Sequence, residues 1–307
     1  MYDIIIIGAG VSGMTSALYS ARSGKKVLIL ESDTIGGQIA LSPRVENYPS
    51  IKQISGEELT SNLFEQITDL GVDFELEKVE KVEKVGKNFV VTTDYETREC
   101  KSVIIATGAK ARKIGVDGEE DLVGHGVSYC AVCDGAFYEG EEVALIGDAN
   151  TALQYGMLLS NSCKKVYVLT LFDRFFGEPG LVKALCNRDN VEVHHNLQLL
   201  QFKQEDGELT GLVFKNTQDG SIFDVNVKGV FIAVGQAPQN EIFKNLVDLD
   251  KNGYIIADEN CTTKVDGLFV AGDTRTKSTR QLTTAVADGS TCGLAACRYI
   301  DQAELGA

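Results

Sequence analysis

Apolar runs of strand length alternate with segments of helical periodicity along most of the chain. Tyr2–Ile7 is rich in isoleucine, as expected for a buried parallel strand, and Met14, Ala17 and Ala21 then recur at helical spacing. Lys26–Leu30 has the apolar character of the next strand. The chain is therefore expected to open with a β-α-β unit.

The same pattern starts again in the middle of the chain. Val143–Ile146 is predicted to be a strand, Ala152–Leu159 a helix and Lys165–Thr170 another strand. Shorter strands are expected around Val191, Leu212, Val225 and Val230–Val234. Gly267–Ala271 as a strand and Gln281–Ile300 as a long helix then resume the first pattern. We predict an α/β fold of two three-layer, Rossmann-like dinucleotide-binding domains, one inserted into the other, with residues 1–112 and 240–307 around residues 113–239.

Three further segments of the first domain have a recognisable pattern. Gly56–Leu70 is expected to be a helix, and Val103–Ala106 a buried strand that ends at Thr107-Gly108. Glu77–Val85 consists of three copies of Glu-Lys-Val, a period that fits neither a strand nor a helix. We interpret it as an exposed ribbon without a function.

Composition narrows the class of protein. The 307 residues carry a formal net charge of −15, which disfavours nucleic acid as a partner because phosphate binding needs a basic surface. No apolar run approaches the roughly 18 residues of a membrane span. The N-terminus enters an apolar strand without a basic region or a cleavage site. We therefore expect a cytoplasmic protein with no membrane partner.

A glycine-rich turn follows the first predicted strand. Gly8, Gly10 and Gly13 have the spacing that lets a pyrophosphate approach the backbone at a helix N-terminus, and Ser12 lies inside this motif. Glu31 ends the next strand, where a carboxylate can accept hydrogen bonds from ribose hydroxyls. The turn therefore predicts a dinucleotide site.

Cys130 and Cys133 form a Cys-x-x-Cys pair that is followed directly by Asp134. This spacing permits a disulfide, and one thiol of such a pair commonly has a lowered pKa. A zinc site would need further ligands at suitable spacing, which the sequence does not offer, so no metal is expected. Asp134 is either an acid or base for the thiol protons or a cap of a helix or turn. The other cysteines are expected to be buried small hydrophobes; they are Cys100, Cys163, Cys186, Cys261, Cys292 and Cys297.

Together these motifs resemble the low-molecular-weight thioredoxin reductases over essentially the whole chain. The matching segments are Gly8–Gly13, Gly36-Gly37-Gln38, Val45–Pro49, Ala106-Thr107-Gly108, Cys130–Gly135, Ala271-Gly272-Asp273, Arg280-Gln281 and Ala287-Asp288-Gly289. The resemblance implies FAD in the first domain, a homodimer, Cys133 facing the flavin, and Cys130 exchanging with the disulfide of thioredoxin. Asp273 is expected near the ribityl or pyrophosphate group. The cofactor-binding set is Gly8, Gly10, Ser12, Gly13, Glu31, Gly36, Gly37, Gln38, Asn47, Ala106, Thr107, Gly108, Asp273, Arg280 and Gln281.

The second domain departs from the pattern of this family. The family has a glycine-rich turn for NADPH, but here Ala149 replaces the middle glycine and Asp148 adds a negative charge. The cations that hold the 2′-phosphate in the family are replaced by Thr170, Leu171, Phe172 and Phe176, and Arg174, at a shifted position, is the one candidate to replace them. In these features the chain is similar to the branch of the family that takes electrons from ferredoxin. The resemblance thus implies ferredoxin as the electron donor.

Three alternatives remain open. The chain could be an NAD(P)H-dependent thioredoxin reductase with a divergent site, or a dithiol oxidase that passes electrons to oxygen, although Asp134 stands where such oxidases tend to carry histidine. It could also be a non-catalytic FAD-binding redox sensor. An acidic electron carrier would need a local basic patch. We hypothesise that two basic clusters border that docking surface, one of Lys110, Arg112 and Lys113 and one around Arg275 and Lys277.

Overall fold

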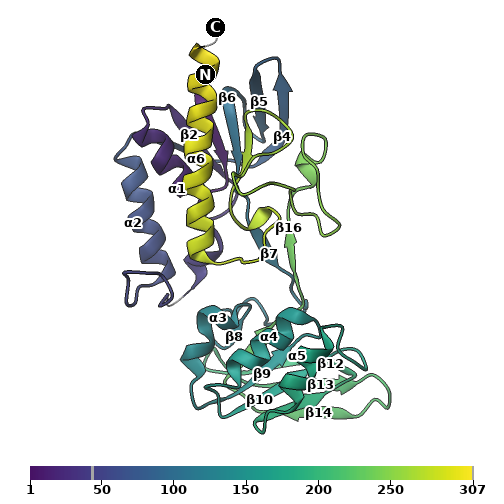
Figure 1. The fold of residues 1–307 in the computed structure, drawn as a ribbon. Helices are drawn as coiled ribbons and strands as arrows, with labels where there is room; N and C mark the ends of the chain where they lie inside the picture. The colour runs from purple at the N-terminus through teal and green to yellow at the C-terminus, as the bar shows by residue number, and fades with distance from the viewer. Residues whose placement is uncertain (43–44, 306–307) are drawn as a thin grey trace. The chain divides into compact units, whose positions relative to one another are not determined.

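The computed structural model describes residues 1–42 and 45–305. The chain divides into two compact units, Met1–Lys110 with Ala237–Ala307, and Ala111–Gln236. We call them the first and the second unit (Figure 1). Strands β7 (Ala109–Ala111) and β16 (Gln236–Pro238) pair at the two points where the chain passes from one unit to the other.

The first unit is built on one sheet with the strand order β3-β2-β1-β6-β5-β4, and β17 lies beside β6. The strands β1, β2, β3, β6 and β17 pair in parallel, whereas β4 and β5 form an antiparallel ribbon with β6. The strands are β1 (Tyr2–Ile7), β2 (Val27–Glu31), β3 (Asp73–Leu76), β4 (Val79–Val85), β5 (Asn88–Thr93), β6 (Thr97–Ile105) and β17 (Leu268–Val270). The helices are α1 (Val11–Arg22), α2 (Gly56–Thr68) and α6 (Leu282–Leu305), with short 3₁₀ turns η1 (Gly37–Leu41), η3 (Glu241–Phe243) and η4 (Gly272–Thr274).

The register of this sheet gathers the expected cofactor residues at one edge. Ile7 lies opposite both Leu30 and Ile105, so β1, β2 and β6 end at the same level. The three helices cover one face of the sheet (Figure 1). The opposite face packs on the β4–β5 ribbon and on the segment around η3. The carboxyl ends of parallel strands are where open α/β sheets bind ligands.

The interpretation of the Glu-Lys-Val repeat as an exposed ribbon is wrong in part. Val79 and Val82 are buried, because a register shift between Val79 and Lys81 lets a spacing of three residues return to the same face of β4. Glu77 is also buried, and it accepts hydrogen bonds from Arg98 and from the Thr93 hydroxyl. The repeat therefore contributes to the core of the first unit.

The second unit has a parallel sheet of order β11-β10-β9-β15-β8 and a separate antiparallel sheet, β12-β13-β14. Its strands are β8 (Val127–Ser128), β9 (Glu142–Ile146), β10 (Lys165–Leu169), β11 (Val191–His194), β12 (Leu197–Glu205), β13 (Glu208–Asn216), β14 (Ile222–Val225) and β15 (Gly229–Ile232). Its helices are α3 (Ala131–Asp134), α4 (Asn150–Leu159) and α5 (Pro179–Cys186), with the 3₁₀ turn η2 (Gly135–Tyr138). The predicted α/β class is thus confirmed.

The structure also bears on the expectations about membrane spans and buried cysteines. No helix in the described ranges is long and apolar enough to cross a membrane. Cys186 is exposed at the end of α5, contrary to the expectation that it is buried, whereas Cys100, Cys163, Cys261, Cys292 and Cys297 are buried. Helix α5 was not predicted, because Pro179-Gly180 at its start reads as a turn.

Candidate active site

The glycine turn after β1 combines two different steric demands. Gly8 has a φ of 109°, and a methyl group on Gly13 would lie 1.9 Å from the Gly8 carbonyl oxygen. These two glycines are required by the protein itself. By contrast, a methyl group on Gly10 would meet no atom within 4 Å in the described part of the chain. Gly10 therefore leaves an open space at the N-terminus of α1, which has no side-chain cap.

Glu31 is anchored beside this open space. One carboxylate oxygen accepts the Ala9 N–H at 2.7 Å, and the other accepts the N–H groups of Ser32 and Asp33 at 2.8 and 3.0 Å. Each oxygen of a carboxylate can accept more than one hydrogen bond, so acceptor capacity remains for a ligand hydroxyl. Glu31 thus presents a fixed carboxylate at the carboxyl end of β2.

Asp273 lies at the carboxyl end of β17 with one oxygen unsatisfied. Its Oδ1 is buried and has no hydrogen-bond partner within residues 1–42 and 45–305. Burial raises the pKa of this carboxyl above its usual value. The Thr107 hydroxyl lies 3.0 Å from that of Thr274, so the end of β6 meets the turn that holds Asp273. A buried acceptor without a partner is what a polar ligand group would complete.

The segment around η1 closes against the glycine turn. The Gly36 N–H donates to the Ala9 carbonyl at 2.9 Å, and a methyl group on Gly36 would collide with Thr60 of α2. Gln38 and Asn47 are exposed, and of the segment between them residues 43–44 lie outside the described structure. Gly37 lies next to Gly10, since a methyl group added to Gly37 would be 3.4 Å from the Cα of Gly10.

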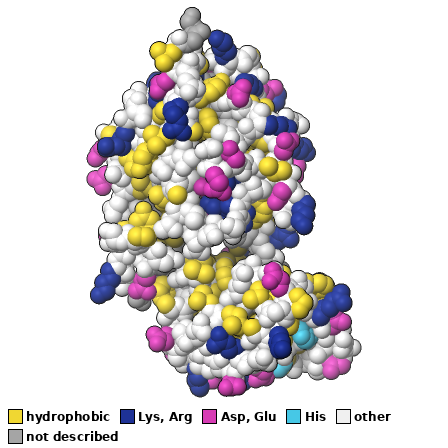
Figure 2. Space-filling model, in the orientation of Figure 1, with side chains coloured by type: hydrophobic (Ala, Val, Ile, Leu, Met, Phe, Trp, Pro, Cys, Tyr) yellow, Lys and Arg dark blue, Asp and Glu magenta, His cyan; other side chains and the backbone are white. Residues whose placement is uncertain are grey.

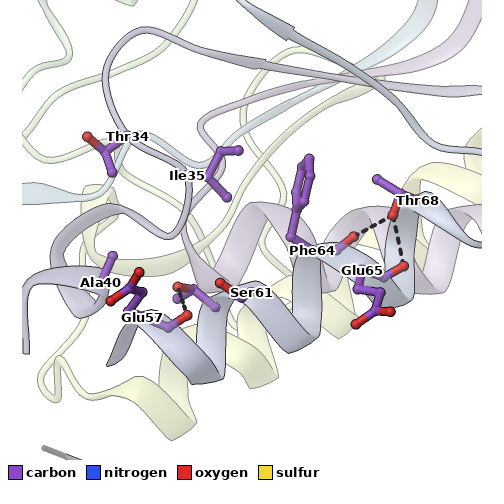
Figure 3. A pocket seen from close by; sticks show the side chains of 9 residues that line it. Thr34, Ile35, Ala40, Glu57, Ser61, Phe64, Glu65 and Thr68 are labelled. Carbon is purple, nitrogen blue, oxygen red and sulfur yellow. Dashed lines mark hydrogen bonds between the residues drawn. The ribbon is translucent and has the colours of Figure 1, made fainter. Parts of the chain in front are cut away.

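A groove of about 540 Å³ runs between this segment and α2 (Figure 3). Ile35 and Phe64 give it apolar walls, and Glu57 and Glu65 lie along the helix beside them. Sequence reasoning did not identify this groove. Its lining includes none of the residues of the expected cofactor-binding set.

The cations after Asp273 do not form a docking surface, contrary to the hypothesis from the sequence. Arg275 is buried, the side chain of Lys277 is 8% exposed, and both donate to the carboxylate of Asp288, at 2.9 and 2.8 Å. The same carboxylate accepts the Gly272 N–H at 3.0 Å. Arg275 and Lys277 therefore hold the turn before α6 in place.

Three of the other expected cations also have partners, whereas Arg112 is exposed. Arg280 donates to the carbonyls of Asp273 and Arg275 and lies over the Tyr254 ring. Lys110 pairs with Asp33 and Lys113 with Glu120. Figure 2 shows basic and acidic side chains interspersed over the visible face.

The redox pair lies in the second unit, directly after β8. Cys130 and Cys133 form a disulfide with their Cα atoms 5.3 Å apart, and Cys130 is the N-cap of the short helix α3. The Cys133 N–H also donates to the Cys130 sulfur at 3.2 Å. A hydrogen bond of this kind stabilises negative charge on sulfur, so it favours a thiolate on Cys130 once the disulfide opens.

Asp134 ends α3 with its carboxyl group turned inward. Oδ2 accepts the Ser128 hydroxyl at 2.6 Å, whereas Oδ1 is buried and without a partner in the described chain. Burial raises the pKa of Asp134, and the hydrogen bond from Ser128 opposes this shift. A carboxyl with a raised pKa directly after a cysteine pair is suited to act as an acid or base for the thiol protons. Sequence reasoning missed Ser128, which precedes the cysteine pair without belonging to a named motif.

The second glycine turn differs from the first at the corresponding position. Gly10 is the extended N-cap of α1, and Ala149 is the extended N-cap of α4, so the Ala149 methyl occupies the place that Gly10 leaves open. Asp148 directly precedes Ala149 in the chain, and burial raises the pKa of its carboxyl group. A bound pyrophosphate would therefore meet a methyl group and a carboxyl group at this turn.

The segment after β10 folds back onto this turn. The Phe176 N–H donates to the Asp148 carbonyl and the Glu178 N–H to Asn150 Oδ1, both at 2.7 Å. Phe172 and Phe176 are 50% and 54% exposed, with their ring centroids 5.3 Å apart. Arg174 lies over the Phe176 ring at 5.2 Å. Aromatic rings thus stand where a phosphate site would need cations.

Comparisons with known proteins show the family to which the chain belongs. A family described as pyridine nucleotide-disulphide oxidoreductase matches residues 2–289. The chain is 36% identical over 302 residues to a thioredoxin reductase of Bacillus subtilis, covering 98% of this chain and 96% of the relative. It is 38% identical over 303 residues to one from Listeria monocytogenes, covering 98% and 95%. A crystal structure of thioredoxin reductase from Streptococcus pyogenes superposes with a TM-score of 0.94 at 37% identity, covering 98% and 99%.

Proposed function

We propose that this chain, which belongs to the pyridine nucleotide-disulphide oxidoreductase family, is an FAD-dependent thioredoxin reductase that takes its electrons from reduced ferredoxin. The observation that carries this proposal is the disulfide followed by an acid with a buried carboxyl oxygen, in a protein whose second nucleotide turn is obstructed. The relatives that share more than a third of its residues are thioredoxin reductases, which supports thioredoxin as the substrate.

The first unit has the features that FAD requires. Gly10 leaves room for a pyrophosphate at an uncapped helix N-terminus, Glu31 presents a carboxylate for ribose hydroxyls, and Asp273 has a buried oxygen to satisfy. When bound there, FAD supplies the capacity to collect electrons singly and to pass them on as a pair. We propose that the first unit binds FAD and that the inserted second unit carries the redox disulfide.

The thiol chemistry follows from the groups around Cys130. In the reduced protein, a Cys130 thiolate attacks a sulfur of the thioredoxin disulfide and forms a mixed disulfide, and one thioredoxin sulfur leaves and takes up a proton. Cys133 loses its proton and attacks Cys130, which re-forms the Cys130–Cys133 disulfide and releases dithiol thioredoxin. Asp134 exchanges the protons that these steps require.

The second unit supports a donor other than a pyridine nucleotide. NADPH would need cations for its 2′-phosphate, and NADH would still need free access to the turn. Ala149 and Asp148 disfavour both, and the Phe176 and Glu178 hydrogen bonds keep the following segment against the turn. A ferredoxin at about −400 mV can drive thioredoxin at about −270 mV, since the difference for two electrons is about 6 kcal/mol downhill.

We also propose that the protein works as a homodimer, as its resemblance to the family implies. Sedimentation equilibrium of the FAD-loaded protein tests this directly. A monomeric mass at micromolar concentration would refute the dimer, but it would not affect the assignment of Cys130 and Cys133 as the redox pair.

Anaerobic mixing of the oxidised protein with separate donors tests the electron source. Reduced ferredoxin is expected to bleach the flavin absorbance rapidly, and NADPH and NADH are expected to bleach it far more slowly. Rapid, saturable bleaching by micromolar NADPH or NADH would identify a nucleotide-dependent reductase instead. In a separate aerobic assay, net consumption of oxygen by reduced thioredoxin and the protein would identify a dithiol oxidase. Absence of any turnover in both assays would favour a sensor.

A further inference from the structure

We propose that Ser128 is a positioning residue for proton transfer at the redox disulfide, an inference that rests on the proposed thioredoxin reductase function. Its hydroxyl lies between the acid and the disulfide: it donates to Asp134 Oδ2 at 2.6 Å and accepts the Cys130 N–H at 3.0 Å. One hydroxyl group thus ties the carboxyl of Asp134 to the backbone of the cysteine that attacks thioredoxin.

Hydrogen-bond accounting assigns different tasks to the two carboxyl oxygens. A serine hydroxyl has a single proton, and since Ser128 uses a lone pair for the Cys130 N–H, its proton is directed at Oδ2 of Asp134. Oδ1 is buried and has no partner in the described ranges. Oδ2 is therefore the oxygen that is held, and Oδ1 is the one left available to exchange a proton with a thiol.

The sheet gives this arrangement its rigidity. Ser128 is buried on β8, where it pairs with Phe231 of β15, whereas Asp134 ends a helix of 4 residues. So short a helix has little stability of its own, and its orientation depends on tertiary contacts. The Ser128 hydroxyl therefore transfers the fixed position of the strand to the carboxyl group on the helix.

The surroundings of Asp134 make its pKa sensitive to this one bond. Within residues 1–42 and 45–305, the phenols of Tyr138 and Tyr155 sense the charge of Asp134. Burial raises the pKa of both, to about 12 for Tyr138, so they are neutral at working pH. Burial raises the pKa of Asp134, and the Ser128 hydrogen bond lowers it by stabilising the carboxylate. Loss of the hydroxyl should therefore raise the pKa of Asp134 further.

The test compares single-turnover reactions of FAD-loaded protein reduced with one equivalent of dithionite. Oxidised thioredoxin and, separately, 5,5′-dithiobis(2-nitrobenzoate) are the acceptors, and rates are measured against pH. Ser128→Ala should lower the thioredoxin rate about tenfold and move the limb governed by Asp134 to higher pH, whether Asp134 acts as acid or base. Ser128→Thr, which keeps a hydroxyl, should retain the wild-type pH profile and most of the rate. Ser160→Ala is the matched control, because it removes a buried serine hydroxyl that donates to a backbone carbonyl of the same unit. It should change neither the thioredoxin rate nor the pH profile.

A double-mutant cycle separates positioning from structure. In the Asp134→Asn background, S128A should change the rate by less than about twofold, because Ser128 has no acid left to position. A loss in that background equal to the loss in the wild type overturns the proposal, as does an unchanged rate and pH profile in S128A. If S128A does not fold, S128T decides: an upward shift of its pH profile overturns the proposal. A wild type that reduces the small disulfide with the same pH profile but not thioredoxin would refute the proposed function and leave this inference standing.

Discussion

The backbone carbonyl of Asp148 accepts the N–H of Phe176 at 2.7 Å, which fastens the segment after β10 to the turn that opens α4. The second unit therefore keeps the sheet of a dinucleotide-binding domain while its turn is occupied by protein groups. The Ala149 methyl stands where the first turn leaves space at Gly10. One unit is thus open at its turn and the other is obstructed.

Rebuilding the second turn should create a response to NADPH. Asp148→Gly and Ala149→Gly remove the obstruction, and Leu171→Arg with Phe172→Arg supply cations for a 2′-phosphate. We expect the fourfold variant to bind NADPH at least about tenfold more tightly than the wild type, since each charge-assisted bond contributes about 1.5–3 kcal/mol. Binding is measured by calorimetry. The matched control carries the same glycines with Leu171→Glu and Phe172→Glu, and equal binding by both variants would contradict the explanation.

Replacing Gly10 by alanine should impair FAD binding, whereas replacing Gly13 by alanine should impair the stability of the fold. Gly10→Ala adds a methyl group that meets no described protein atom, so the free energy of unfolding of the FAD-free protein should change by less than about 1 kcal/mol, while FAD binding is lost. Gly13→Ala places the methyl group 1.9 Å from a carbonyl oxygen and should destabilise the fold itself. Urea unfolding and flavin content distinguish the two. Normal FAD retention in Gly10→Ala would remove the first turn from the cofactor site.

The cysteine pair should be indispensable, and the exposed thiol should not. Cys130→Ser and Cys133→Ser each remove one half of the disulfide, so thioredoxin reduction should fall to background while FAD stays bound. Cys186→Ser replaces the exposed free cysteine of the same unit and should leave the rate unchanged. Turnover is followed by the appearance of thioredoxin thiols. Residual turnover in either active-site variant would show that electrons bypass the pair.

Much of this site could be predicted because its signals are local. The order of strand, glycine turn and helix places Gly10, and spacing alone pairs Cys130 with Cys133. Residues whose partners are distant in sequence could not be placed in this way. Arg275 was interpreted as a free surface cation, because nothing near it in the sequence indicates that Asp288 neutralises it in the core.

Irregular backbone also limited what could be predicted from the sequence. The register shift in β4 buries Val82 against the expectation from its period of three residues, and no residue type marks that shift. Ser128 lies in a strand of 2 residues, too short for any periodicity to show. Its importance follows only from the hydrogen bonds that it makes with Asp134 and Cys130.

The buried carboxylate of Asp288 should make the first unit sensitive to acid. Burial alone would raise its pKa, but hydrogen bonds from Arg275 and Lys277 outweigh burial and hold the pKa below its usual value. The contribution of ionised Asp288 to the free energy of unfolding is therefore present at pH values above the pKa of the unfolded state, near 3.9. It is lost as pH falls through the pKa of Asp288 in the folded state. Asp288→Asn should lower the free energy of unfolding by about 3–5 kcal/mol at pH 7, because it leaves two buried cations unpaired, and by less in acid.

Asp248→Asn is the control for this comparison. It breaks an exposed ion pair with Lys264, so it should change the free energy of unfolding by no more than about 1 kcal/mol at any pH. Urea titrations at pH 7 and below about pH 3 provide the measurement. Equal effects of the two substitutions at pH 7 would show that the Asp288 network contributes little.

The most direct measurement of the central claim is the rate at which thioredoxin thiols appear under anaerobic conditions, with reduced ferredoxin or NADPH as the only electron source. The proposed function predicts rapid thiol formation with ferredoxin, abolished by Cys130→Ser, and formation at least about a hundredfold slower with NADPH, since several charge-assisted phosphate contacts are missing. Thiol formation with NADPH as fast as with ferredoxin, or none with ferredoxin, would contradict it.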